Sequence, residues 1–356
     1  MRISQAMFSK GFGGAERSFV DTVSLLSRAG HEVQALCHVD FMAQDRLEME
    51  NVTVEPLNIS GEWNPLSQHA VSRAIERYRP DLVHAHLRRA AWFAGKAGHM
   101  AGIPVVAKLH NYVDLTRYRY VNTLIATTAD ECRYALAQGW SPNRVTIIPN
   151  FSSLPVRNPQ AAPTGQPLRL LSYGRFVQKK GFDLLLQAAA ELRDEGLEFV
   201  LTLGGEGAEQ AALEAIIADR GLSDSVKMIG WVEDVVPLLE QADLFILPSR
   251  SEPFGIVILE AMACGVPIVS TWAEGPREIL DGTTTYFASV DSQSSLTDAM
   301  RRAMGDPDGR LQHAQNALAT FREHYSEGAF RLKLLELYKQ LAQETHRKTD
   351  SVGGLA

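Results

Sequence analysis

The stretch LRLLSYGRFVQKKGFDLLLQAAAELR, residues 168–193, decides the fold class. It opens with an apolar run at 168–174, which is typical of a buried strand, and closes with an amphipathic pattern at 182–193, which predicts a helix. A loop with one glycine and three cations joins them. Because a strand followed by a helix is the repeating unit of a parallel sheet, this stretch predicts an α/β fold.

The same alternation extends in both directions along the chain. In the second half, the predicted strands are residues 168–174, 198–203, 226–229, 243–248, 267–271 and 285–289. In the first half, they are residues 2–8, 32–38, 52–57, 81–86, 104–110, 123–128 and 145–149. Helical patterns lie between most of them, so the sequence predicts two Rossmann-like domains.

Residues 152–167 separate the two series and are dense in proline and small polar residues, which is typical of a linker. We therefore expect a first domain at residues 1–165 and a second domain at residues 166–326. The last amphipathic pattern covers residues 327–344, and no strand follows it. This helix can therefore pack back on the first domain.

The composition is that of an ordinary globular enzyme, with 45% hydrophobic and 22% charged residues among 356. Three widely spaced cysteines indicate neither a disulfide framework nor a zinc site. The sequence shows no apolar run of the roughly 18 residues that a membrane span needs and no signal-peptide core, so we expect a cytoplasmic protein.

The charge is divided unevenly between the two halves of the chain. Residues 1–165 hold 17 basic and 14 acidic residues, a net of +3, whereas residues 166–356 hold 18 and 28, a net of −10. The total of −7 argues against nucleic acid as a partner. The first half is suited to an anionic partner, although scattered solvated charge explains the same numbers.

Cations follow the first strand of the second domain. Arg175 and Lys180 lie in the loop between that strand and its helix. Ligands of open α/β sheets bind at the carboxyl ends of the strands, and a diphosphate is the anion that Arg and Lys would hold there. A solvated basic loop is the alternative interpretation.

Two glutamates, Glu252 and Glu260, follow a later strand of the same domain. A helix starting at Pro253 would carry both on one side, since eight residues are just over two turns. Its first free N–H groups, at Phe254 to Ile256, would then face the same crevice as the basic loop. Glu252 taken alone is also explained as a stabilising acid at a helix start.

Glycines also follow the first strand of the chain, where Gly13 and Gly14 open a long helix. Backbone N–H groups at such a turn can approach an anion. A tight turn that needs glycine for steric reasons fits equally well.

Several motifs together resemble family 4 of the retaining glycosyltransferases. They run in order along nearly the whole chain: G-G-A-E at 13–16, V-x-A-H at 83–86, L-H at 109–110, I-P-N at 148–150, G-R-F-x-x-x-K-G at 174–181 and E-x7-E at 252–260. The resemblance implies the GT-B architecture, in which two Rossmann-like domains face each other across a cleft and the second binds a nucleotide sugar. Together with A-E-G-P-R-E-I-L at 273–280, the G-G-A-E segment is most similar to enzymes of lipopolysaccharide core or other envelope glycan synthesis.

The resemblance also implies roles for individual residues. Arg175 and Lys180 would hold the donor diphosphate, Glu252 the donor sugar and Glu260 the ribose. His110 would reach the reacting sugar, although a buried structural histidine is the alternative, as it is for His84 and His86. Further donor contacts are expected at Gly13, Gly14, Gly205, Glu206, Val232, Phe254, Gly255, Ile256 and Val257.

The expected reaction is transfer of a hexose-type sugar with retention, in which the leaving phosphate helps to deprotonate the acceptor hydroxyl. We expect no metal and no cofactor beyond the nucleotide sugar, because cations stand where a metal would be needed and the D-x-D at 306–308 fits a helix break. The sequence leaves a UDP-, GDP- or ADP-linked donor open. The expected acceptor is a glycan or glycolipid.

The anionic partner of the first half would then be the cytoplasmic face of the inner membrane, contacted peripherally through Arg88, Arg89, Arg117 and Arg119.

Three other functions use the same fold. A nucleotide-sugar 2-epimerase would need no acceptor, and a phosphorylase would need a cofactor-linked lysine that nothing in the sequence indicates. A non-catalytic nucleotide-sugar-binding subunit would have no need for the full set of basic and acidic site residues.

Overall fold

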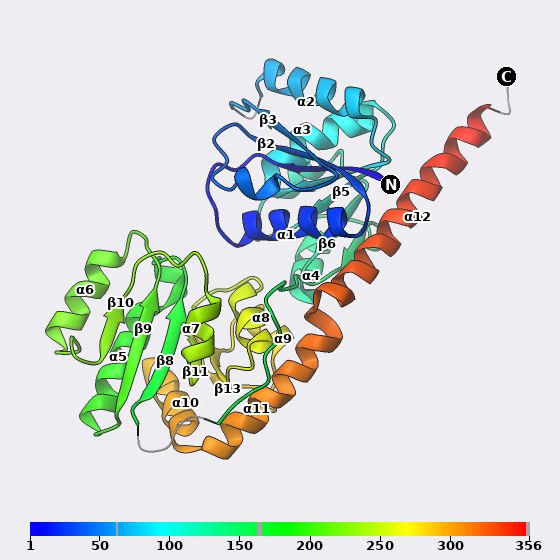
Figure 1. The fold of residues 1–356 in the computed structure, drawn as a ribbon. Coiled ribbons are helices and arrows are strands. Elements are labelled where there is room, and N and C mark those ends of the chain that lie inside the picture. The colour runs from blue at the N-terminus through cyan, green and yellow to red at the C-terminus, as the bar shows by residue number, and fades with distance from the viewer. Residues whose placement is uncertain (62, 162–165, 354–356) are drawn as a thin grey trace. The chain divides into compact units, whose positions relative to one another are not determined.

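The computed structural model describes residues 1–61, 63–161 and 166–353, with side chains as far as residue 344. The chain forms two compact units (Figure 1). The first unit comprises Met1–Phe151 with Glu327–Ala356, and the second comprises Ser152–Ser326.

The first unit is built on a seven-stranded parallel sheet with the order β3-β2-β1-β4-β5-β6-β7. The strands are β1 (Arg2–Met7), β2 (Glu32–His38), β3 (Val52–Leu57), β4 (Leu82–His86), β5 (Val105–Lys108), β6 (Thr123–Ala126) and β7 (Val145–Ile147). The chain reverses direction across the sheet between β1 and β4, so the loops at the carboxyl ends of these two strands border the crevice where such sheets bind ligands.

Five α-helices cover this sheet in the described residues: α1 (Gly14–Arg28), α2 (Pro65–Tyr78), α3 (Leu87–Met100), α4 (Ala129–Ala137) and α12 (Glu327–Gly353). Local sequence sets their ends. Asn64 accepts a hydrogen bond from the backbone N–H of Leu66, and Pro65 occupies the first position of α2. Arg79 ends the same helix in the left-handed conformation.

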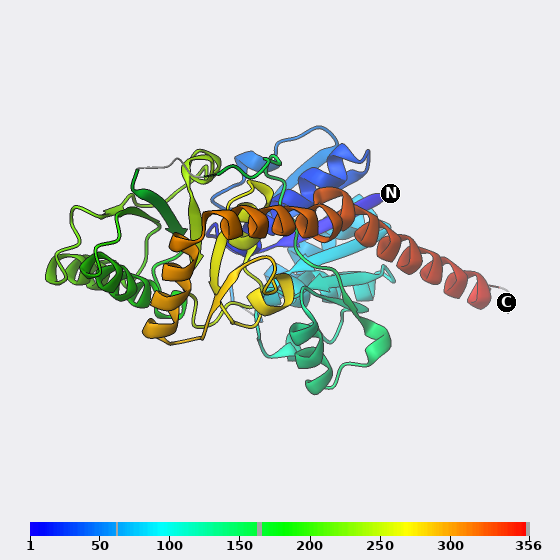
Figure 2. The ribbon, with the colours of Figure 1, turned by 90° about the horizontal axis from the view of Figure 1, so that it is seen from below.

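Helix α12 lies beside α1 in both views of the first unit (Figures 1 and 2). Its apolar side chains Phe330, Leu334 and Tyr338 are buried in one cluster with Phe19 of α1. At the start of α12, Glu327 pairs with Arg28 at 2.6 Å. The chain thus returns to its first domain because α12 carries an apolar stripe that this sheet covers.

The second unit is built on a six-stranded parallel sheet with the order β10-β9-β8-β11-β12-β13. Its strands are β8 (Leu168–Tyr173), β9 (Phe199–Gly204), β10 (Val226–Met228), β11 (Leu244–Leu247), β12 (Ile268–Thr271) and β13 (Tyr286–Ala288). Its helices are α5 (Phe182–Asp194), α6 (Gln210–Asp219), α7 (Val236–Gln241), α8 (Ile256–Ala263), α9 (Pro276–Ile279), α10 (Gln293–Gly305) and α11 (Pro307–Thr320). Here the direction reverses between β8 and β11, which makes their carboxyl ends the expected ligand site.

The α/β fold with two Rossmann-like domains, predicted from the alternating pattern, is confirmed. The predicted boundary at residue 165 lies outside the described residues, and the first unit already ends at Phe151. The reason is that the next residues pack on the second unit. The N–H of Arg157 donates to the carbonyl of Ala263, and a Cβ added at Gly265 would come within 2.7 Å of the nitrogen of Pro159.

Candidate functional site

The carboxyl ends of β8 and β11 carry an ion pair between two residues that the sequence analysis selected. Nζ of Lys180, in the loop after β8, donates a hydrogen bond to Oε2 of Glu252, in the loop after β11. Both side chains are mostly buried, with exposed fractions of 18% and 10%. A charge pair held at a topological switch point is a candidate ligand site rather than ordinary surface charge.

Backbone contacts hold the two loops together. Gly181 adopts a φ of +68°, and a Cβ there would lie 2.1 Å from the carbonyl oxygen of Pro248, so only glycine fits. The carbonyl of Lys179 accepts hydrogen bonds from the N–H groups of Arg250, at 2.8 Å, and Ser251, at 3.2 Å. Lys180 is therefore fixed beside Glu252 by the fold of both loops.

Glu252 is in turn held by a residue that the sequence analysis did not select. Its N–H donates to Oε2 of Glu274 at 3.0 Å, and its carbonyl accepts from the N–H of Gly275 at 2.8 Å. Gly275 is needed there, since a Cβ would lie 2.3 Å from the carbonyl oxygen of Phe254. The available signal was the A-E-G-P-R-E-I-L segment, which carried the finer family resemblance and contains both residues.

The prediction of one helix carrying both glutamates is wrong. Helix α8 begins at Ile256, after Gly255 with a φ of +97°, and that left-handed residue breaks the helical path from Pro253. Glu252 therefore precedes the helix, and the first helical N–H groups are those of Ile256 and Val257 instead of Phe254.

Glu260 lies on α8 with only 2% of its surface exposed. Its Oε2 accepts a hydrogen bond from the hydroxyl of Tyr173, the last residue of β8, at 2.7 Å. The carboxylate therefore lies at the base of the same strand end as the basic loop.

Two further loops, after β9 and after β10, meet the basic loop at this edge of the sheet. The N–H of Gly205 donates to the carbonyl of Gly230 at 2.6 Å, and the N–H of Phe176 donates to the carbonyl of Glu206 at 2.8 Å. A Cβ at Gly204 would lie 2.6 Å from a methyl group of Val232. The structure thus brings Gly205, Glu206 and Val232 together next to the basic loop, as the nucleotide-pocket interpretation requires.

Three cations share the loop after β8. Burial, together with the charges of Lys180 and Arg175, lowers the pKa of Lys179, and Glu252 partly offsets this. Arg175 is exposed. Like charges this close repel one another, so an anion bound among them would be stabilised.

At the first strand of the chain, the glycine turn is closed by a side chain. The N–H of Gly13 donates to Oε2 of Glu16 at 3.0 Å, and the hydroxyl of Ser9 donates to Oε1 at 2.5 Å. Gly14 is the first residue of α1. This N–H is thus satisfied inside the protein, which favours the steric interpretation of the turn for Gly13.

Three histidines stack at the carboxyl ends of β4 and β5. His84 and His86 are fully buried, and His110 is partly exposed just beyond β5. The rings of His84 and His86 are 4.3 Å apart at their centroids, and those of His86 and His110 are 5.5 Å apart. Burial is the main cause that lowers the pKa of all three, and the nearby Lys108 acts in the same direction. Neutral imidazoles are therefore favoured.

Lys108 is a second residue that the sequence analysis missed. It is fully buried, its Nζ donates to the hydroxyl of Ser18 at 3.2 Å, and it lies 4.9 Å from the ring centre of Phe330 on α12. Burial lowers its pKa from 10.5 to about 7, although the carboxylates of Glu131 and Asp21 oppose the shift. A lysine in a strand gives no sequence signal of burial, because the covering helix comes from the far end of the chain.

Within the described residues, no group of three or more His, Cys, Asp or Glu side chains could hold a metal ion. The D-x-D motif is a helix break, as predicted, since Oδ1 of Asp306 caps α11 by accepting from the N–H of Gly309 at 2.9 Å. None of the described helices has the length and hydropathy of a membrane span.

Two family models match the chain. The model "Glycosyltransferase Family 4" matches residues 12–153, and "Glycosyl transferases group 1" matches residues 157–320. The chain is also similar to the lipopolysaccharide core biosynthesis glycosyltransferase LpsE of Rhizobium meliloti (strain 1021). The two are 28% identical over 353 residues, which cover 95% of this chain and 98% of LpsE.

Solved structures with the same fold include Anabaena Alr3699/HepE in complex with UDP. Its TM-score is 0.83 at 21% identity, covering 96% of this chain and 100% of that one. The apo form of the lipopolysaccharide outer core galactosyltransferase WaaB has a TM-score of 0.76 at 18% identity, with 96% and 100% coverage.

The two Rossmann-like units and these neighbours define the fold class of the protein, the GT-B fold. The two family models, which together reach from residue 12 to residue 320, identify its family. The chain belongs to the family 4 glycosyltransferases. The resemblance drawn from its motifs is confirmed at this level.

Proposed function

We propose that the protein transfers a hexose from a nucleotide sugar to a glycan or glycolipid acceptor, with retention, in the synthesis of lipopolysaccharide or another envelope polysaccharide. The match to LpsE, a lipopolysaccharide core biosynthesis glycosyltransferase, covers 98% of that protein, and this supports the pathway class. The complex of the structural neighbour HepE with UDP supports a nucleotide sugar as donor.

The observation that carries the proposal is the Lys180–Glu252 pair at the switch point of the second unit. Lys180 and Arg175 bind the donor diphosphate, and the N-terminus of α8, at Ile256 and Val257, adds backbone donors. Glu252 accepts hydrogen bonds from hydroxyls of the donor sugar. Glu260 binds the ribose from its position against Tyr173.

In the reaction, the bond between the anomeric carbon and the diphosphate oxygen breaks as the acceptor oxygen bonds to the same face of that carbon. The proton of the acceptor hydroxyl passes to the departing phosphate oxygen. Lys180 and Arg175 stabilise the negative charge that develops on the diphosphate, so the step needs no metal. His110, whose pKa is lowered by burial and by the charge of Lys108 so that the imidazole is neutral, contacts the reacting sugar.

We also propose peripheral contact with an anionic membrane surface through Arg88, Arg89, Arg117 and Arg119. Arg88 and Arg89 lie in the first turn of α3, and Arg117 and Arg119 lie in or just after the short 3-10 helix Leu115–Tyr118. All four belong to the first unit, whose half of the sequence has the positive net charge.

The test is a thermal-shift screen of UDP-, GDP- and ADP-sugars followed by product analysis. We expect sugars of one nucleotide, UDP, GDP or ADP, to raise the melting temperature of the protein. The glycosylated acceptor should keep the anomeric configuration of the donor sugar. The Lys180→Ala variant should lose the stabilisation, whereas Lys227→Ala, an exposed lysine of β10, should retain it. Epimerised nucleotide sugar without acceptor would support the epimerase, and stabilisation without turnover would support a binding subunit; either result refutes the transfer.

A further inference from the structure

Aromatic rings and guanidinium groups alternate on one surface of the first unit. The Cζ atom of Arg117 lies 4.0 Å from the ring centre of Trp63 and 5.0 Å from that of Trp92. The Cζ atom of Arg119 lies 4.7 Å from the ring centre of Trp92 and 5.0 Å from that of Tyr120. We call these five residues the cation–π ladder.

The ladder is assembled by three separate segments of the chain. Trp63 precedes α2, Trp92 belongs to α3, and the two arginines belong to the segment after β5. Trp92 is 7% exposed and anchors the ladder, whereas Trp63 is 69% exposed. Trp63 also contacts the ring of Trp92 edge to face, with the ring centroids 5.3 Å apart, so its neighbours hold the indole while most of its surface stays open.

Stacking fixes how a guanidinium presents its donors. All five N–H groups of arginine lie in the plane of the group, so rings that cover its faces leave the edges as the direction of hydrogen bonding. Phosphate accepts two parallel hydrogen bonds from such an edge. Because stacking already limits the rotamers of Arg117 and Arg119, less conformational entropy is lost when an anion binds.

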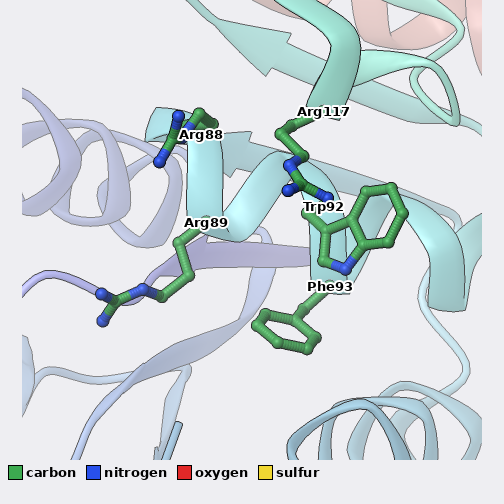
Figure 3. Close-up of a pocket in the computed structure, with 5 residues that line it drawn as sticks. All are labelled: Arg88, Arg89, Trp92, Phe93 and Arg117. Atoms are coloured by element: carbon green, nitrogen blue, oxygen red, sulfur yellow. The ribbon is translucent and has the colours of Figure 1, made fainter. Parts of the chain in front are cut away.

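A small depression, partly open to solvent, adjoins the ladder and is lined by Arg88, Arg89, Trp92, Phe93 and Arg117. Figure 3 shows Arg117 lying against Trp92, with the ring of Phe93 beside them and Arg88 and Arg89 leaving α3 on the other side. Trp92 and Phe93, which are 7% and 1% exposed, form its floor, and Arg88 and Arg89 form a basic wall that suits an anion.

The basic wall stands at the start of a helix, and Nη1 of Arg89 donates to the carbonyl of Phe8 at 3.2 Å. Arg88 and Arg89 lie in the first turn of α3, where the helix dipole disfavours positive charge. The turn into α3 also requires a φ of +66° at Leu87, a strained value for leucine. The oxygens of Asp114 accept from the N–H and hydroxyl of Thr116, which chiefly lowers the pKa of this carboxylate, and the charges of Arg88 and Arg117 act in the same direction.

We infer that the ladder and the depression bind a phosphate group on the acceptor, so that the acceptor is a phosphorylated sugar or a sugar carried on a lipid phosphate. The edges of Arg117 and Arg119 hold the phosphate. The inference rests on the proposed function, since it names the chemical class of its acceptor. Binding of the phosphate requires the planar guanidinium forks of Arg117 and Arg119, and positive charge alone does not suffice.

The test follows the Nε–H signals of arginine in ¹H–¹⁵N spectra during titration with glucose 6-phosphate and, separately, with glucose at equal ionic strength. The signals of Arg117 and Arg119 should shift with the phosphate and not with glucose. Arg117→Lys and Arg119→Lys keep the charge and lose the fork, so each should weaken binding by about tenfold or more. Arg73→Lys, an exposed arginine of α2 outside the ladder, is the matched control and should bind normally.

The same spectra with anionic phosphatidylglycerol vesicles distinguish the two sources of phosphate. Shifts with both probes support a lipid-linked acceptor, and shifts with glucose 6-phosphate alone support a soluble sugar phosphate. Shifts with vesicles alone, equal shifts with glucose, or unweakened binding by both lysine variants would overturn the inference. Failure of the proposed function is seen separately, as absence of turnover with every nucleotide sugar, because the arginine spectra need no donor.

Discussion

Nζ of Lys180 and Oε2 of Glu252 are joined by a hydrogen bond that links the loop after β8 to the loop after β11. The two residues are 72 positions apart in the sequence, and the parallel order of the strands brings them together. Since both side chains are mostly buried, each keeps the other from being an unpaired charge. The pair is thus both a structural link and the centre of the proposed donor site.

We predict that Lys180→Ala and Glu252→Ala each lose most of the turnover while the fold is retained, because both lie at the sheet edge and not in an apolar core. Loss of one charge-stabilising group typically costs about 3 to 4 kcal/mol, or roughly 10² to 10³ in rate. The measurement is kcat with the best donor, beside circular dichroism. Lys227→Ala serves as the control, and near-normal turnover in either site variant would remove these residues from the site.

Activity is expected to be unchanged by EDTA. Arg175 and Lys180 supply the positive charge that a metal would otherwise bring to the departing diphosphate. The assay is initial rate before and after dialysis against the chelator, followed by readdition of Mg²⁺ or Mn²⁺. A rate that falls with the chelator and returns with the metal would contradict this assignment of the cations.

Hydrogen bonds along the stacked histidines specify one tautomer for His110. The amide nitrogen of Gln5 donates to the hydroxyl of Tyr338 at 3.0 Å, so its carbonyl oxygen is the atom that lies 2.9 Å from Nε2 of His86. Nε2 of His86 must then carry the proton, and its Nδ1 becomes an acceptor because burial favours the neutral ring. Nδ1 of His86 lies 3.3 Å from Nε2 of His110, which must therefore be the donor.

We predict that ¹⁵N–¹H spectra of histidine-labelled protein show both His86 and His110 protonated at Nε2 near neutral pH. Gln5→Met removes the acceptor and should release His86 from that single tautomer, with kcat more affected than stability. The conservative Tyr338→Phe variant keeps the amide of Gln5 beside His86 and should change the spectrum less. An Nδ1-protonated His110 in the wild type would show that the hydrogen-bond chain runs in the opposite direction.

Lys108 should make the stability of the first unit depend on pH. Its folded pKa of about 7 lies below the unfolded value of 10.5, so between these values the unfolded chain binds more protons. The free energy of unfolding therefore rises with pH through this window, by up to about 1.4 kcal/mol per unit. Below pH 7 the lysine is charged in both states, and its destabilising effect is fully present.

The measurement is hydrogen exchange of β5 amides at several urea concentrations, for the wild type and for Lys108→Met. Other titrating groups are common to the two proteins, so the difference between them isolates Lys108. The wild type should gain stability relative to the variant from pH 7 to pH 10. A difference that stays constant with pH would mean that Lys108 stays charged in the folded protein.

Local patterns predicted the fold because they report local physics. The strand predicted at 168–174 is observed as Leu168–Tyr173, since an apolar run between polar loops has only one way to be buried in a parallel sheet. The start of α8 was mispredicted because Pro253 fits the first turn of a helix as well as it fits a loop. The left-handed Gly255 that decides between them is not visible in residue types alone.

The partly predicted site shows the same limit. Arg175, Lys180 and Glu252 carry charge in recognisable spacings, whereas Glu274 joins them only through the fold, 22 residues after the backbone it binds. The cation–π ladder was foreseen as a set of arginines but not as a stack. Its order depends on Trp63 and Trp92, which no periodicity connects to the segment after β5.

If the acceptor lies at the inner leaflet, the first unit should bind anionic vesicles peripherally, since each of Arg88, Arg89, Arg117 and Arg119 can contribute roughly 1 kcal/mol near such a surface. Binding should weaken steeply with salt, because a Debye length of about 8 Å at physiological ionic strength screens exposed charges.

The assay is co-sedimentation with anionic liposomes across a salt series, for the wild type, for the quadruple Arg→Gln variant and for Arg73→Gln as the control. The wild type and the control should sediment at low salt and the quadruple variant should not. The prediction fails if the wild type stays in the supernatant at low salt or if the quadruple variant sediments equally well. The net charge of +3 on residues 1–165 would then be ordinary surface charge without a membrane partner, and a soluble acceptor would be favoured.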